Sequence, residues 1–235
     1  MTRDECAFAD LIEQAEQYGP ITMSVAHPCS PESLMGAVES AEHGLITPIL
    51  VAPRARLEKL AESCDIDLSR YRIEDVEHSH AAAERAVELV RNGEAQALMK
   101  GSLHTDEFMS AALDRHKGIR TDRRISHVFI MKVESYPRYL FITDAAINIS
   151  PDLKTKVDIT QNAIDAARML GIDTPKVAIL SAVETVSPNI PSTIDAAALC
   201  KMADRGQIKG GLLDGPLAFD NAVSLVAAKT KGIRS

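Results

Sequence analysis

The sequence contains no tryptophan, and only 4% of its residues are aromatic. Its four cysteines, Cys6, Cys29, Cys64 and Cys200, are far apart and form no CxxC pair. This spacing predicts neither a zinc site nor a disulfide framework. We therefore expect reduced, mostly buried thiols in a cytoplasmic protein.

An excess of basic residues is also lacking. The chain has 26 lysines and arginines against 33 acidic residues, which gives a formal net charge of −7. This balance argues against a general nucleic-acid-binding protein, which needs positive charge to neutralise phosphates. It leaves room for a small basic pocket that binds an anionic ligand.

Long apolar runs are missing as well. No stretch reaches the roughly 18 apolar residues of a membrane span, although 46% of the residues are hydrophobic and can form a sizeable core. The N-terminal sequence MTRDECAFADLIEQAEQYG indicates an acidic amphipathic helix, not a signal peptide, because no basic region precedes an apolar run. We therefore expect no membrane partner.

Strand and helix patterns alternate along most of the chain. We expect strands at 21–26, 45–52, 95–100, 176–182 and 208–213, and helices at 30–44, 80–92, 105–114, 150–170, 192–205 and 220–231. Ser30, Ser150 and Ser192 are the expected N-caps. The alternation predicts an α/β fold with a doubly wound, mainly parallel sheet.

Two β-rich runs, ISHVFIMKV and RYLFITDA, interrupt this alternation and predict an antiparallel hairpin near 125–145. The hairpin suggests a second subdomain or an interface element. We place the boundary near residue 120, with a first α/β domain at 1–120 and a second at 121–235.

In open α/β sheets, ligands bind beyond the carboxyl ends of strands, so the turns there are candidate sites. Lys100 and Gly101 end a strand before a helix, where backbone N–H groups attract phosphate, although no Walker loop is present. Arg124 and Ser126 lie in the arginine-rich stretch RTDRRISHV, and arginine suits bidentate phosphate recognition. The alternative for Lys100 and Gly101 is an ordinary capped turn, and the alternative for the arginine-rich stretch is a solvated basic edge. We expect His127 to be a structural histidine with its polar atoms satisfied.

Three later turns carry further candidates. Asp144 and Asn148 follow the hairpin and could contact a ligand. In the alternative interpretation, their side chains bond only the backbone. The polar loop after the 176–182 strand holds Ser181 and Glu184. The last turn combines Asp214, Gly215 and Pro216. In the alternative interpretation Asp214 and Asp220 are turn and cap residues.

Several long blocks resemble the phosphate acetyltransferase/phosphate butyryltransferase family in order and spacing. They are ISHVFIM, ITDAAINISPDLKTKVDITQNAIDAARMLGI, PKVAILSAVETV, PSTIDAAALCKMADRGQIKGG and LDGPLAFDNAVS. The similarity extends from about residue 20, and it is greatest to the butyryltransferase-like branch, including the acyltransferase half of fusions with an enoyl-CoA hydratase domain.

The resemblance implies reversible transfer of a short acyl group, acetyl or butyryl, between CoA and inorganic phosphate. Acyl-CoA, CoA, phosphate and acyl phosphate are the implied partners, with no metal, no cofactor and no covalent acyl-enzyme. It also implies an isocitrate dehydrogenase-like fold, two subdomains around a cleft that holds CoA, and a homodimer or larger homo-oligomer.

We assign candidate roles on this basis. Arg124, Ser126 and Asp214 are the catalytic candidates, with Arg124 and Ser126 on the phosphate side. The substrate-binding candidates are Lys100, Gly101, Asp144, Asn148, Ser181, Glu184, Gly215 and Pro216.

The sequence also departs from the family pattern. In the family, further βα units follow, and one late segment carries a Ser-Arg and an acid that the resemblance assigns to transition-state stabilisation and thiol activation. Nothing here matches that segment, so we expect severely impaired catalysis, or a non-catalytic protein that binds CoA or phosphate or oligomerises. A dehydrogenase of the related fold is a third hypothesis. The absence of a GxGxxG turn argues against it, although that fold group does not rely on the motif.

Overall fold

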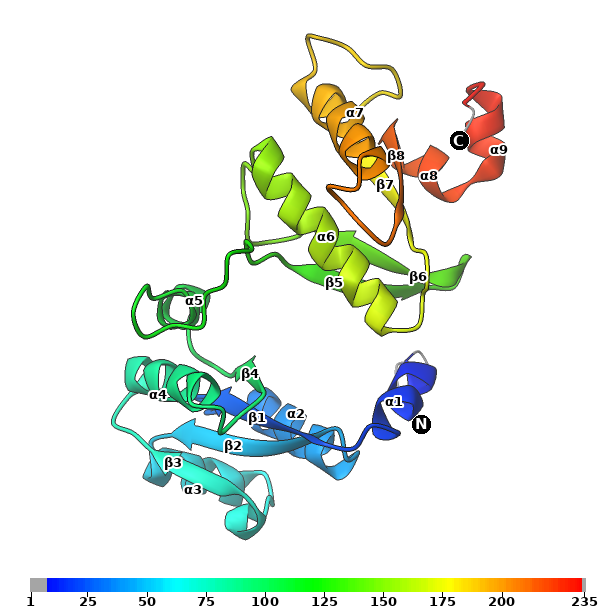
Figure 1. Cartoon of the computed structure of the whole chain (residues 1–235). Helices are drawn as coiled ribbons and strands as arrows, with labels where there is room; N and C mark the ends of the chain where they lie inside the picture. The colour runs from blue at the N-terminus through cyan, green and yellow to red at the C-terminus, as the bar shows by residue number, and fades with distance from the viewer. Residues whose placement is uncertain (1–7, 234–235) are drawn as a thin grey trace. The chain divides into compact units, whose positions relative to one another are not determined.

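The computed structural model describes residues 8–233, which fall into two compact units (Figure 1). Unit 1 extends to Asp122 and unit 2 begins at Arg123. Residues 1–7, where part of the expected N-terminal helix falls, lie outside the described range. No helix between residues 8 and 233 is long and apolar enough to cross a membrane.

Unit 1 is built from alternating strands and helices. Its elements are α1 (Ala9–Glu16), β1 (Ile21–Ala26), α2 (Pro31–Glu42), β2 (Ile46–Ala52), α3 (Arg54–Ser63), the 3₁₀ turn η1 (Leu68–Arg70), β3 (Arg72–Asp75), α4 (Ser79–Arg91), β4 (Ala97–Lys100) and α5 (Thr105–Ala112).

The sheet of unit 1 is parallel throughout, with the strand order β3-β2-β1-β4. One apolar cluster, which includes Leu34, Leu50 and Leu57, joins the sheet to α2 and α3. A second cluster, which includes Val51 and Leu89, joins its other face to α4 and α5. Figure 1 shows α3 and α4 on opposite sides of the strands. The predicted α/β class is therefore confirmed, with helices on both faces of a parallel sheet.

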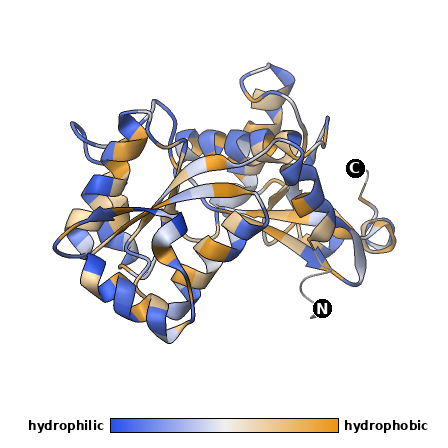
Figure 2. Ribbon diagram, turned by 90° about the horizontal axis from the view of Figure 1, so that it is seen from below, coloured by the Kyte–Doolittle hydropathy of each residue, from blue (hydrophilic) through white to orange (hydrophobic). Residues whose placement is uncertain are grey.

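The helices are amphipathic, and in Figure 2 hydrophobic and hydrophilic turns alternate along them. Helix α2 begins as its sequence predicts, because Ser30 caps it and Pro31 occupies the first turn. The Ser30 hydroxyl accepts a hydrogen bond from the Ser33 amide, while the Ser33 hydroxyl accepts one from the Ser30 amide. This capping box satisfies two amide donors at once.

Unit 2 contains two small sheets and four helices among its described residues. Its elements are β5 (Val128–Val133), β6 (Tyr136–Thr143), α6 (Leu153–Met169), β7 (Lys176–Leu180), α7 (Pro191–Asp204), β8 (Leu212–Leu217), α8 (Phe219–Val223) and α9 (Leu225–Thr230). Strands β5 and β6 form the predicted antiparallel hairpin, and β7 pairs with β8 in parallel. Ile164, Leu199 and Ile208 form the buried core that joins α6 to α7.

Three sequence predictions about element ends in unit 2 are wrong. Asp152, not Ser150, caps α6, because its carboxylate accepts from the Thr155 amide. Ser192 does not cap α7, since its hydroxyl bonds the Ser181 hydroxyl and Ile190 holds the N-cap position. The expected helix at 220–231 breaks at Ser224, whose hydroxyl caps α9.

The stretch around Asp214 also differs from expectation. The sequence predicts a strand at 208–213 that ends in an Asp-Gly-Pro turn, but β8 starts at Leu212 and runs through these residues. The chain instead changes direction at Gly210, where φ is +84°. Only glycine adopts this conformation without strain, so the pair of glycines at 210–211 makes the turn.

A close approach of two loops constrains unit 1 at Gly101. The Gly101 amide donates to the Ala26 carbonyl at 2.8 Å. A Cβ added there would lie 2.5 Å from the carbonyl oxygens of both Ala26 and His27. These are backbone atoms, which cannot rotate away.

We therefore expect Gly101→Ala to lower the free energy of unfolding by about 1–3 kcal/mol, as overpacked sites typically do. The matched control is Gly36→Ala in α2, where an added Cβ meets nothing within 4 Å and helix propensity gives a gain of about 0.5–1 kcal/mol. Urea denaturation followed by circular dichroism measures both changes. Equal effects of the two substitutions would contradict the close approach.

Candidate active site

The loop that carries Arg124 and Ser126 is held by one face of α6. The Asp158 carboxylate accepts from the Arg124 amide at 3.0 Å. The Asn162 side-chain amide donates to the Arg124 carbonyl at 2.9 Å and to the Ser126 hydroxyl oxygen at 2.8 Å. The loop has no regular secondary structure, so these three hydrogen bonds fix its shape.

The two arginines of this loop have different environments. Arg123 forms an ion pair with Asp165 at 2.6 Å, and its guanidinium also donates to Asn162. The Arg124 side chain is exposed and lies within ion-pair distance of no carboxylate among residues 8–233, although its charge contributes to lowering the pKa of Asp152. Arg124 therefore combines a fixed backbone with an uncommitted guanidinium.

Asp144 and Asn148 lie beside this loop. Thr143 at the end of β6 pairs with Val128 at the start of β5, which brings the residues after β6 next to the loop before β5. The Asp144 carboxylate accepts from the amides of His127, Ala146, Ile147 and Asn148, at 3.0–3.2 Å, and from the Asn148 side chain at 2.5 Å. The Asn148 side chain also donates to the Ile125 carbonyl. Most of these bonds go to the backbone, as the alternative interpretation expects, but the bond between Asp144 and Asn148 joins two side chains.

These hydrogen bonds act on the ionisation of Asp144. Partial burial opposes the charged form, but the bonds from Asn148, Ile147, Ala146 and His127 outweigh it and lower the pKa of Asp144 to about 2. The carboxylate is therefore ionised at neutral pH. Its role here is to join the β6–α6 loop to the start of β5.

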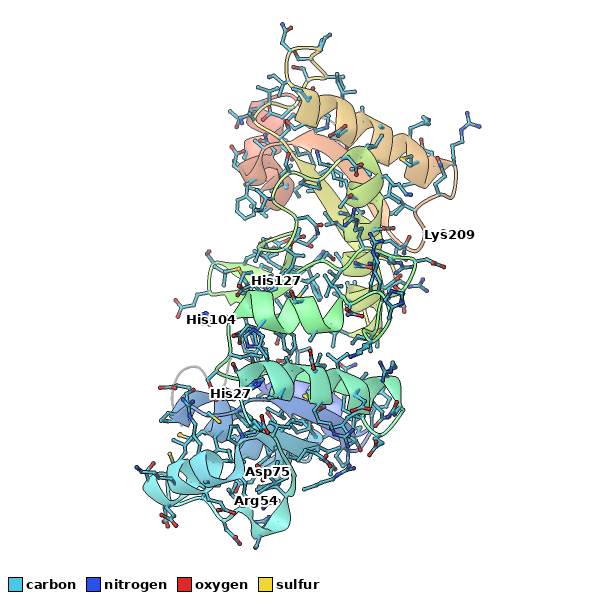
Figure 3. All side chains as sticks on the ribbon, turned by 90° about the vertical axis from the view of Figure 1, so that its left-hand side faces the viewer. His27, Arg54, Asp75, His104, His127 and Lys209 are labelled. Atoms are coloured by element: carbon cyan, nitrogen blue, oxygen red, sulfur yellow. The ribbon has the colours of Figure 1, made fainter. Side chains whose placement is uncertain are left out.

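His127 only partly matches its prediction as a structural histidine. Its backbone amide bonds Asp144, and its ring packs edge-on against Phe129 at 4.4 Å between centroids (Figure 3). The ring nitrogen Nδ1 is buried without a hydrogen-bond partner, so the expectation that its polar atoms are satisfied is wrong.

A second polar cluster lies beyond the carboxyl ends of β7 and β8. The Asn221 side-chain amide donates to Glu184, which also accepts from the Lys231 ammonium at 2.9 Å. Lys231 lies 3.4 Å from Asp220 as well. The Lys231 bond is the main reason that the pKa of Glu184 falls below its usual range. Glu184 therefore ties α8 and the end of α9 to the loop after β7.

The other predicted residues of this region lie within or against β8. The Ser181 hydroxyl bonds Ser192, which joins the end of β7 to the start of α7. Asp214 pairs with Ala178 inside the parallel ladder, and Pro216 is buried. A Cβ on Gly215 would lie 2.7 Å from the Ile179 carbonyl oxygen, so this glycine permits close strand packing.

Lys100 and Gly101 lie in unit 1, at the carboxyl end of β4. Strand β4 adds to the side of β1 opposite β2 and β3, so the order of the strands reverses between β1 and β4. Open α/β sheets bind ligands at this switch point. The loops that follow these two strands contain Lys100 and Gly101 from β4, and His27 from β1.

His27 connects the two loops (Figure 3). The Ser102 hydroxyl lies 3.2 Å from its Nδ1 and donates to its carbonyl at 3.0 Å. The Cys29 amide donates to the same hydroxyl. His27 is 5% exposed and has a φ of +53°, which is strained for a residue with a Cβ. Burial, and to a smaller extent the charge of Arg56, lowers the pKa of His27, which favours the neutral ring.

The structure thus brings the predicted residues into three groups. Arg124, Ser126, Asp144 and Asn148 form one, Glu184 belongs to a second with Asn221 and Lys231, and Lys100 and Gly101 belong to a third with His27. Within residues 8–233, no group of three or more His, Cys, Asp or Glu side chains could hold a metal ion.

Sequence reasoning missed the residues that hold the first group. Asp158, Asn162 and Asp165 recur at intervals of four and three, which places them on one helical face. Such a polar stripe opposite an arginine-rich loop was the available signal. Asn221 and Lys231 had no comparable signal, because their partner Glu184 is distant in sequence.

Comparison with known proteins identifies the class to which this site belongs. The fold is shared with solved phosphotransacylases, among them a branched-chain phosphotransacylase from Enterococcus faecalis V583, which is 27% identical with a TM-score of 0.75 over 92% of this chain and 75% of that chain. A phosphotransacetylase from Streptococcus pyogenes, at 21% identity and a TM-score of 0.79, shares the fold. The family model described as phosphate acetyl/butaryl transferase matches residues 79–235. The chain belongs to this family, which is one of acyltransferases.

Relatives of known name agree with this assignment. A phosphate acetyltransferase from Rhizobium meliloti is 60% identical over 96% of this chain and 71% of its own length. A phosphate butyryltransferase from Clostridium beijerinckii is 40% identical over 96% of this chain and 75% of its own length. Against others, such as the phosphate acetyltransferase of Rickettsia prowazekii, the chain spans 65% of the relative. These matches confirm the family that the sequence blocks resemble and leave no basis for the dehydrogenase hypothesis.

The Asp144 contacts predict a pH-dependent contribution to stability. The pKa of Asp144 is depressed from 3.8 to about 2 in the folded protein. The stabilisation is therefore complete above the unfolded pKa and is lost as the pH falls toward 2. We expect Asp144→Asn to lower the free energy of unfolding by on the order of 1–2 kcal/mol at pH 7, and by much less near pH 2.

Urea denaturation at several pH values measures this difference. Asp173→Asn removes an exposed acid from the same unit and serves as the control. A difference between Asp144→Asn and wild type that stays constant from pH 7 to pH 2 would show that the carboxylate bonds do not carry the stabilisation.

Proposed function

We propose that this chain transfers an acetyl group reversibly between CoA and inorganic phosphate, and that the Arg124–Ser126 loop binds the phosphate. The observation that carries the proposal is the anchoring of Arg124. Its amide and its carbonyl are both held by α6, whereas its guanidinium has no carboxylate partner in the described chain. A guanidinium on a fixed backbone suits a tetrahedral oxyanion, which it can bind through two parallel N–H donors.

Ser126 complements this donor set. Its hydroxyl oxygen accepts a hydrogen bond from Asn162, so its own proton points elsewhere and is available to an anion. Asn162 therefore positions both residues, since its side chain bonds the Arg124 carbonyl as well. Arg124 and Ser126 together offer a positive charge and a hydroxyl donor within three residues of chain.

The proposed reaction is a direct exchange at one carbonyl. An oxygen of hydrogen phosphate attacks the thioester carbon, and the new C–O bond forms. The C–S bond breaks, the CoA thiolate leaves, and the proton that the hydrogen phosphate loses ends on the thiol. Holding phosphate in place converts this attack into an effectively unimolecular step. Arg124 would orient the phosphate, and donors at the carbonyl oxygen would stabilise the tetrahedral intermediate.

The remaining candidates are proposed to bind CoA. Lys100 and Gly101 lie at the switch point of the unit 1 sheet, which supports a role with the phosphates of CoA. Ser181, Glu184, Gly215 and Pro216 stay candidates for CoA contacts at the ends of β7 and β8. Asp214 stays a catalytic candidate, while Asp144 and Asn148 support the phosphate loop from behind.

Further parts of the proposal concern the acyl group and the assembly. The acetyltransferase relative is 60% identical and the butyryltransferase relative 40%, which favours acetyl over butyryl. CoA and phosphate enter as substrates, and no cofactor is proposed. We propose a cytoplasmic location for the protein. We also propose a homo-oligomer, because Phe129 and Met131 of the hairpin are 52% and 45% exposed and suit a subunit contact.

The test is CoA release from acetyl-CoA in the presence of phosphate, with butyryl-CoA as the comparison. Arg124→Gln should lower kcat/KM for phosphate by about 10²-fold, the usual loss for a transition-state donor. Arg124→Lys should restore part of it, because the charge returns without the fork. Arg120→Gln, which removes an exposed arginine outside the α6 contacts, should leave the rate unchanged.

Two results would overturn the proposal. Equal rates for wild type and Arg124→Gln would remove Arg124 from the reaction. Absence of turnover by the wild-type chain with either acyl-CoA would remove the transfer activity itself.

A further inference from the structure

A polar cavity in unit 2 lies beside the Arg124 loop and contains two cations, Arg168 and Lys209, that the proposed reaction does not use. Its volume is about 410 Å³, and it lies between one face of α6 and the loop from α7 to β8. The lining residues are Arg123, Val157, Asp158, Gln161, Asp165, Arg168, Gln207 and Lys209. Figure 3 labels Lys209 on the loop between α7 and β8.

The charged side chains that line the cavity differ in whether they have hydrogen-bond or ion-pair partners. Asp158 accepts from the Arg124 amide, and the two oxygens of Asp165 accept from Arg123 and Gln161. By contrast, Arg168 and Lys209 lie within ion-pair distance of no carboxylate among the described residues, although the charge of Arg168 contributes to lowering the pKa of Asp165. Three cations face two carboxylates, so the lining carries a net positive charge even though the whole chain carries −7.

Local contacts hold the Lys209 backbone and the Arg168 side chain at the edge of the cavity. The Gln161 side chain makes a two-point contact with the Lys209 backbone, accepting from its amide at 2.8 Å and donating to its carbonyl at 2.9 Å. The Arg168 guanidinium packs over Gly210, where an added Cβ would lie only 2.6 Å from Nη1. The missing side chain of Gly210 therefore makes the space that Arg168 occupies.

We propose that this cavity binds the phosphate group of a phosphate-bearing small molecule, with Arg168 and Lys209 as its ligands. Arginine offers a bidentate fork and lysine a point charge, a combination suited to a phosphate dianion. The volume lies within the range of small-molecule sites and exceeds the space that a bare phosphate fills. The inference does not rest on the acyl transfer proposed above.

Calorimetric titration of adenosine 5′-monophosphate and of inorganic phosphate into the full chain tests the site. The Arg124→Gln background removes the phosphate site proposed for the reaction, and the part of the remaining binding that depends on Arg168 and Lys209 reports the cavity. Arg168→Gln or Lys209→Gln should each raise Kd by about tenfold, as expected when one charge-assisted contact is lost. Arg205→Gln is the matched control, because it removes an exposed cation four residues before Lys209 that does not line the cavity.

The two probes separate the sources of the phosphate group. Tighter binding of the nucleotide indicates a phosphomonoester, and equal binding indicates inorganic phosphate. Either outcome supports the site when Arg168→Gln and Lys209→Gln weaken the binding of the probe and Arg205→Gln does not.

Two results would overturn the inference. One is no binding of either probe at millimolar concentration. The other is an equal loss of affinity in all three variants, which would show attraction to surface charge in general. Thermal unfolding of each variant checks that it folds, and Arg168→Lys supplies a second variant that keeps the charge but loses the bidentate fork.

Discussion

Burial of one face of α6 is the constraint on which the arrangement of unit 2 depends. Ile164 is fully buried, and Ile159, Ala163 and Ala167 lie on the same apolar face. Because this face has to pack against the core, the rotation of the helix about its axis is fixed. Its polar side chains must then face the loop before β5. The hydrophobic core thus decides which residues hold Arg124, although it touches none of its polar atoms.

Unit 1 solves a related problem through its backbone. The loops after β1 and β4 meet at the switch point, and their carbonyl and amide groups bond each other directly. The approach is close enough that Gly101 has no room for a Cβ, and His27 adopts a positive φ. Such strain persists where surrounding contacts over-determine it, and it is common where a fold prepares a ligand site. Here the Ser102 hydroxyl supplies those contacts.

The sequence predicts the elements better than the contacts between them. Periodicity and the Ser30 cap place β1 and α2 correctly, because both depend on neighbouring residues. The prediction fails at β8, since a Gly-Pro pair normally marks a turn, but Gly215 serves here to let β8 approach Ile179. It also misses Asn162 as the residue that holds Ser126, because that bond joins positions 36 apart in the chain. A long-range hydrogen bond leaves no local pattern of its own, so the polar stripe of α6 and the charge of the arginine-rich loop were the available guides to it.

The distribution of charge explains how an acidic chain can favour anionic substrates. A net charge of −7 repels an anion at long range, but salt screens that repulsion beyond about 8–10 Å. Within that distance, the attraction of an anion depends on which charged side chains already have partners in the protein. The carboxylates near the Arg124 loop, Asp144, Asp158 and Asp165, all accept hydrogen bonds from the protein, so much of their charge is neutralised locally. The exposed guanidinium of Arg124 acts on Asp152 through its charge but forms no close ion pair with it, so it remains open to a ligand. In the proposed function, selectivity for phosphate depends on which charges are already paired, rather than on their total.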